Sequence, residues 1–206
     1  KTGADGVLEA DNVNAQLRLR HLRGDGMPDV NDNVAADFSA FRLRGSRLGD
    51  VVHSTPIYVG VPASGWPDAD PFGVGEDSVT GVVRNRFSDF KNRTLANGGA
   101  EDREPVVYVG ANDGMLHGFN AKSSGSGAGE EVLAYVPYSL ASTSVGEGLH
   151  YLTDPDYIHR YYVDLAPVVQ DVYIDTTSPV ASSSRDWASI LVGGLRGGGR
   201  GLFALD

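Results

Sequence analysis

The chain has 206 residues, of which 41% are hydrophobic and 21% charged, an ordinary balance for a globular protein that buries a core. Its 27 acidic and 17 basic residues give a net charge of −10, which argues against nucleic acid or an anionic membrane surface as the main partner, because both need a cationic face. The chain contains no cysteine and no apolar run near the ~18 residues of a membrane span, so we expect neither disulfides nor a transmembrane helix.

Glycine is the compositional outlier, with 27 residues spread along the chain between short apolar runs. This pattern is typical of strands joined by tight turns, because glycine reaches positive φ without a Cβ clash. Residues 1–49 are polar, and we expect an irregular lead-in to the domain in which residues 14–22 fit either a helix or a strand. Residues 51–61 favour a strand, with a strand start, edge or bulge near Pro56. Residues 62–104 are expected to form a long polar insertion.

The clearest strand signals lie between residues 106 and 136. Residues 106–109 form a continuous apolar run, as in a strand covered on both faces. Asn112-Asp113-Gly114 predicts a tight turn, because Asp-Gly is a strong hairpin signal. Residues 115–121 then read as the returning strand, and residues 132–136 as a further one.

The strand pattern then recurs, with strands predicted at residues 167–174, 187–192 and 201–205. Val109-Gly110 and Val192-Gly193 each precede a glycine-bearing turn and a returning strand, and Pro105 and Pro167 each open an apolar run. We therefore predict an all-β chain, with roughly two quinoprotein-like β-propeller blades of about four strands each within residues 50–206. Two blades cannot close a ring, so we expect a fragment of a larger propeller.

One polar stretch has the spacing of a calcium loop. Hard oxygen donors at relative positions 1, 3, 5 and 9 would come from Asp29, Asn31, Asn33 and Asp37. Val34 stands where such a loop has glycine, and Ala40 replaces its bidentate glutamate. A solvated turn of Asn and Asp residues is the alternative interpretation.

A second candidate site is a tripeptide, Arg23-Gly24-Asp25, that spells an integrin-recognition motif. Adhesion through this motif needs an exposed, protruding loop, so that the carboxylate of Asp25 can reach a metal ion of the partner. The alternative is a structural segment in which Arg23 pairs locally.

A third candidate is a cluster of polar and aromatic residues, namely His159, Arg160, Tyr161, Tyr162 and Asp164. A catalytic His–Asp pair is one interpretation, since a carboxylate can orient an imidazole. However, neighbours along a strand point to opposite faces, and no serine or cysteine stands in a nucleophile-elbow context. We therefore favour a buried hydrogen-bonded network that joins one blade to the next.

Several of these segments resemble the propeller domain of PilC/PilY proteins, namely residues 22–25, 47–56, 107–117, 159–164, 191–194 and 199–206. The Tyr-Val-Gly-x-Asn-Asp-Gly piece is shared with quinoprotein-type propellers. Leu-Gly-Asp-Val-Val-His-Ser-Thr-Pro followed by His-Arg-Tyr-Tyr-Val-Asp points to the pilus family. Gly118 and Asn120 stand where alanine and aspartate are more usual, and the family's own calcium loop would lie beyond residue 206.

The resemblance implies a non-enzymatic factor that promotes type IV pilus assembly and extension, surface adhesion and twitching motility, modulated by calcium in the full protein. It implies export to the pilus tip or outer membrane surface of a Gram-negative bacterium, with minor pilins and a host or abiotic surface as partners. The alternatives are an oxidoreductase that holds pyrroloquinoline quinone and an outer-membrane assembly propeller. The absence of vicinal cysteines and of tryptophan-docking repeats argues against the oxidoreductase.

Overall fold

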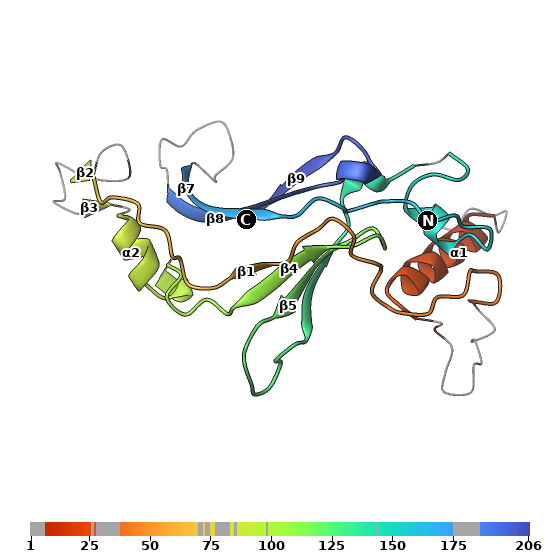
Figure 1. The fold of residues 1–206 in the computed structure, drawn as a ribbon, viewed down its shortest axis with the longest axis horizontal. Helices are drawn as coiled ribbons and strands as arrows, with labels where there is room; N and C mark the ends of the chain where they lie inside the picture. The colour runs from red at the N-terminus through yellow and green to blue at the C-terminus, as the bar shows by residue number, and fades with distance from the viewer. Residues whose placement is uncertain are drawn as a thin grey trace.

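The computed structural model describes residues 7–25, 27, 38–69, 72, 75–76, 83–84, 86–97, 99–142, 144–174 and 186–206. Two antiparallel sheets lie one above the other in Figure 1. Helix α1 (Val7–Leu22) lies at one end of the molecule; helix α2 (Phe87–Asn92) and the short hairpin of β2 (Gly75–Glu76) and β3 (Val83–Arg84) lie at the other. Among the described helices, none is long and apolar enough to cross a membrane.

The first sheet has four strands in the order β1-β4-β5-β6, which are β1 (Ile57–Val59), β4 (Val106–Gly110), β5 (Leu116–Asn120) and β6 (Glu131–Tyr135). The three predicted strands between residues 106 and 136 are confirmed. The predicted turn joins β4 to β5, with Gly114 at φ 91°. Strand β1 is much shorter than the strand expected at residues 51–61, and it begins directly after Pro56, which cannot donate to a ladder.

The second sheet has three strands in the order β7-β8-β9, which are β7 (Val168–Ile174), β8 (Asp186–Gly194) and β9 (Leu202–Leu205). All three lie where the recurring pattern predicts them. Short 3-10 helices occupy connections in the described part of the chain, among them η2 (Leu95–Asn97), η3 (Tyr138–Leu140), η4 (Leu149–Thr153) and η5 (Arg196–Gly198).

The two sheets repeat the same order of strands, and the repeat begins with β1 in one sheet and β7 in the other. Strands β1 and β7 contact each other, and each is the first strand of its sheet, directly after Pro56 and Pro167 respectively. Pro105 and Pro167 each precede a strand as predicted, but Pro105 precedes β4, the second strand of its sheet, so Pro56 is the structural equivalent of Pro167. A long connection between β1 and β4 hides the true period from the sequence.

The main hydrophobic core lies at the junction of the sheets and the long connection from β6 to β7. Leu116 on β5 and Val163 before β7 are fully buried, and Leu152 of η4 is 1% exposed. Leu22 at the end of α1 and Leu191 on β8 belong to the same core. Both sheets and α1 thus share one apolar centre.

Residues 1–49 are not irregular throughout, because α1 fills residues 7–22. The apolar residues of this segment do not form a clear stripe, so periodicity alone left helix and strand open. Contacts far along the chain hold the helix instead: buried Arg44 donates hydrogen bonds to the carbonyls of His21 and Leu22 at the helix C-terminus, where the last carbonyls have no partner within the helix. Arg18 donates to the carbonyl of His150.

The expected polar insertion at residues 62–104 contains a second hydrophobic core. Phe87 and Phe90 of α2 are buried against Trp187 of β8, with the Phe87 and Trp187 rings 4.8 Å apart. Trp66 and Phe72 pack against the same cluster. The sequence does not reveal this second core, because its aromatic residues are widely spaced and bury their surface against a distant strand.

Candidate functional site

Three chain segments that resemble the pilus family meet where the two sheets join. They are the approach to β1, the turn between β4 and β5, and the approach to β7. We call this polar cluster the sheet joint, and it consists of Gly49, Asp50, His53, Ser54, Asn112, Asp113, His159, Tyr162 and Asp164.

Asp164 and His53 form the direct bond between the approaches to the two sheets. The Asp164 side chain is 1% exposed, and its carboxylate accepts hydrogen bonds from the backbone N–H of His53 at 3.2 Å and from the imidazole Nδ1 at 2.7 Å. His53 lies three residues before Pro56, and Asp164 three residues before Pro167. Equivalent positions of the two repeats thus bond to each other.

Asp50 and Asn112 form a second link within the joint. The Asn112 amide donates to the Asp50 carboxylate at 2.9 Å, and its side-chain oxygen accepts from the backbone N–H of Tyr162 at 3.0 Å. His159 Nε2 donates to the same Asp50 carboxylate at 2.9 Å. Partial burial alone would raise the pKa of Asp50, but the hydrogen bonds from Asn112 and His159 lower it below its ordinary value.

A third set of contacts joins β5 to the turn before it and to β6. His117 is buried, and its ring donates to Asp113 through Nε2 at 3.0 Å and to Glu131 through Nδ1 at 2.5 Å. An imidazole that donates from both nitrogens is the protonated form, because carboxylates only accept. Burial alone would lower the pKa of His117, but the two carboxylates raise it above 6.5.

Two glycines let these segments approach closely. A Cβ on Gly49 would lie 2.4 Å from the backbone nitrogen of Asp113, and Gly49 itself donates to the Asp113 carboxylate at 2.6 Å. A Cβ on Gly110 would lie 2.3 Å from the carbonyl oxygen of Val163. The backbones touch where any side chain would separate them, which gives both glycines a packing role.

The structure separates the five clustered residues predicted as one motif. Tyr162 and Asp164 are buried in the joint, whereas His159 and Arg160 are exposed, with Arg160 over the ring of Tyr151. Tyr161 lies between the rings of His53 and His159, at 5.3 and 5.5 Å. His159 and Asp164 bond to different partners, so the structure does not assemble the catalytic pair considered from the sequence.

Sequence reasoning interpreted His53 and His117 as isolated structural residues and did not connect them with this motif. The resemblance to the pilus family was the signal that could have identified these partners. The segments that carry it contain Asp50, His53, Asn112, Asp113 and His117. Their pairing could not be inferred, because His53 and Asp164 lie 111 positions apart.

The tripeptide Arg23-Gly24-Asp25 ends helix α1. Gly24 has φ 92° and donates to the carbonyl of His21, while Asp25 N–H donates to the carbonyl of Arg20. This pattern is a Schellman C-cap with glycine at its left-handed position. Gly24 is buried, whereas Arg23 and Asp25 are exposed, and the Asp25 carboxylate pairs with Arg20 Nε at 3.0 Å.

The predicted calcium ligands, Asp29, Asn31, Asn33 and Asp37, all lie outside the described residues. Within the described part of the chain, no group of three or more acidic or histidine side chains is arranged to hold a metal ion. Calcium binding by this loop stays a prediction.

The chain is similar to proteins of type IV pili. A family model described as the PilY1 beta-propeller domain matches residues 68–206. The type IV pilus biogenesis factor PilY1 of Pseudomonas aeruginosa is 37% identical over 201 residues, which are 96% of this chain and 14% of that protein. A PilY1 homolog of Xylella fastidiosa is 34% identical over 204 residues, which are 98% of this chain and 12% of that protein.

A solved structure gives a further match, the crystal structure of the Pseudomonas aeruginosa PilY1 C-terminal domain. It is 34% identical, with a TM-score of 0.36, and covers 59% of this chain and 18% of that one. The chain thus spans only about an eighth of the length of the curated relatives it matches, from 12% to 14%. The family model covers well over half of the chain, which confirms both the resemblance and the all-β propeller fold. The chain belongs to the PilY1 β-propeller domain family.

Proposed function

We propose that this chain is part of the scaffold of a type IV pilus biogenesis factor and supports pilus assembly and extension without catalysis. One observation carries the proposal: three of the segments that resemble the family come together in a single hydrogen-bonded joint between two sheets. The proposal is supported by the relatives, which are named biogenesis factors. A rigid sheet scaffold can present loops as contact surfaces.

Complementation of a deletion strain tests this role. We expect deletion of the gene to remove surface pili, and the intact wild-type gene to restore them. Asp164→Ala removes the bonds between Asp164 and His53 in the sheet joint, so it should restore far fewer pili than Asp156→Ala. Asp156→Ala changes an exposed carboxylate on the same connection between β6 and β7. The measurement is the number of pili per cell by electron microscopy, with protein levels matched by immunoblot. Normal piliation in the deletion strain would refute the proposal, and quinone-dependent dye reduction by the purified protein would favour the oxidoreductase.

We further propose that the protein is exported to the pilus tip or outer surface, where minor pilins are its partners and a host or abiotic surface its target. Adhesion and twitching would follow from this position. Exposed Arg23 and Asp25, on either side of a buried glycine, are the proposed contact for host cells.

A pair of variants tests that contact directly. Asp25→Glu keeps the charge but moves the carboxylate, whereas Arg20→Gln breaks the local ion pair and leaves the tripeptide intact. We expect Asp25→Glu to reduce binding of the protein to cultured mammalian cells, and Arg20→Gln to leave it unchanged. Unchanged binding by Asp25→Glu would exclude adhesion through this site.

Calcium modulation is proposed through the loop of Asp29, Asn31, Asn33 and Asp37. Titration calorimetry with Ca²⁺ should detect a site that the double variant Asp29→Asn and Asp37→Asn removes. The absence of a binding signal from the wild-type chain would exclude calcium at this loop.

A further inference from the structure

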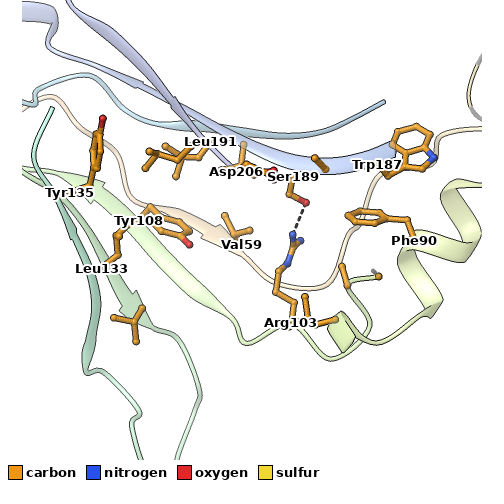
Figure 2. Close-up of a pocket in the computed structure, with 17 residues that line it drawn as sticks. Val59, Phe90, Arg103, Tyr108, Leu133, Tyr135, Trp187, Ser189, Leu191 and Asp206 are labelled. Atoms are coloured by element: carbon orange, nitrogen blue, oxygen red, sulfur yellow. Dashed lines mark hydrogen bonds between the residues drawn. The ribbon is translucent and has the colours of Figure 1, made fainter. Parts of the chain in front are cut away.

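A cleft with a volume of about 570 Å³ lies between the two sheets, beside helix α2. Protein interiors contain few voids larger than a water molecule, whereas small-molecule sites have volumes of roughly 300–1,000 Å³. The cleft between the facing sheets is therefore of a size that a small molecule can fill. Figure 2 shows side chains of both sheets pointing into it.

The walls of the cleft are mostly apolar and aromatic. Tyr108 comes from β4, Leu133 and Tyr135 from β6, and Leu191 from β8, while Phe90 of α2 lies toward one end (Figure 2). Such a lining binds water poorly and favours the body of an apolar or aromatic molecule.

One cationic side chain enters this apolar space. Arg103 is held in place by the carbonyl of Gly60, which accepts from Nε at 2.8 Å and also from Nη2, and by Ser189 Oγ, which accepts from Nη1 at 2.5 Å. Ser189 in turn donates to Asp171 at 2.7 Å. These bonds use three of the five N–H groups of the guanidinium, so two remain for a further acceptor.

The charge of Arg103 is only partly compensated. Asp171 acts on it through Ser189, and Asp206 also lines the cleft, but among the described residues no carboxylate forms an ion pair with the guanidinium. Burial lowers the pKa of Arg103 more than the charge of Asp171 raises it. An anion beside Arg103 would therefore be stabilised in a way that a neutral molecule of the same shape would not.

We propose that the cleft binds a small organic anion, whose carboxylate or sulfonate group pairs with Arg103 and whose aromatic or branched apolar body lies against Tyr108, Leu133 and Leu191. The net charge of −10 opposes anion binding anywhere on the chain, so the attraction has to come from Arg103 itself. This inference rests on the cleft alone and does not depend on the role in pili.

Two fluorescent probes of similar shape test the proposal on the purified protein. 1-Anilinonaphthalene-8-sulfonate carries a sulfonate, and N-phenyl-1-naphthylamine is its neutral counterpart. We expect the anionic probe to bind with saturation, and Arg103→Gln to weaken its affinity about tenfold or more, because a hydrogen bond between charged groups is lost. The neutral probe should change less than about threefold. Arg200→Gln, at an exposed arginine, is the control for nonspecific attraction.

A second pair of variants fills space on opposite faces of β6. Leu133 lines this cleft, whereas Ala134 lines a separate hollow of about 600 Å³ on the other face. Leu133→Trp should abolish binding of the anionic probe, and Ala134→Trp should preserve it, with near-UV circular dichroism confirming that each variant is folded. Binding that survives Leu133→Trp, or that Arg103→Gln does not weaken, would overturn the proposal.

Discussion

Removal of the Asp164 carboxylate is the sharpest test of the sheet joint. Asp164→Ala leaves the backbone N–H of His53 without its acceptor and breaks the 2.7 Å bond from the imidazole. A buried group that loses its partner costs about 1–3 kcal/mol. The imidazole is 40% exposed, so water replaces part of its lost bond. We therefore expect a loss of about 3 kcal/mol in the free energy of unfolding.

Asp164→Asn should cost less, about 1 kcal/mol, because an amide oxygen still accepts from the His53 N–H while the charge is lost. Urea unfolding followed by tryptophan fluorescence measures both changes, since Trp66 and Trp187 pack together in the second core. With a slope of about 2 kcal/mol per molar, Asp164→Ala should lower the midpoint by about 1.5 M. A shift below about 0.3 M, no larger than that of Asp156→Ala, would refute the view that this bond holds the sheets together.

Three further changes have defined outcomes. Gly110→Ala should destabilise the chain by about 2 kcal/mol or more, because its Cβ meets the Val163 carbonyl at 2.3 Å, whereas Gly65→Ala, with open space around it, should be nearly neutral in the same urea assay. Gly24→Ala should cost about 1–2 kcal/mol because of its φ of 92°, and a thermal midpoint equal to that of the wild type would contradict the C-cap role. Because the pKa of His117 is raised in the folded chain, its protonated imidazole stabilises the fold fully below pH 6.5. This contribution is lost as the pH rises through the higher folded pKa. Urea midpoints across that range should therefore fall more steeply for the wild type than for His117→Gln, and parallel curves would contradict the assignment.

The strands could be predicted because their signals are local. Residues 106–109 are a continuous apolar run between Pro105 and Gly110, and residues 187–192 are mostly apolar and end at Gly193; both form strands partly covered by other parts of the chain. Helix α1 could not be predicted in the same way. Its partners, Arg44 and His150, lie outside the helix, so no pattern within residues 7–22 reports them.

The joint was predicted only in part, for a related reason. The cluster from His159 to Asp164 pointed to a hydrogen-bonded network, but its acceptors and donors lie on other segments. His117 is paired with Asp113 four positions away across a tight hairpin, not along a helix as that spacing usually means. Local spacing therefore identified the residue types, while the fold determined which of them meet.

The sheet joint and the cleft are related, because both lie between the same two sheets. Apolar contact is not directional, and it is interrupted where the cleft separates the sheets. Directional bonds contribute to the angle between them: His53 with Asp164 at the joint, and Arg103 with Ser189 across the cleft. A scaffold held in this way keeps a defined shape while leaving room for a ligand between its blades. The residues that fix the sheets and the residues that would bind an anion are thus two parts of one arrangement.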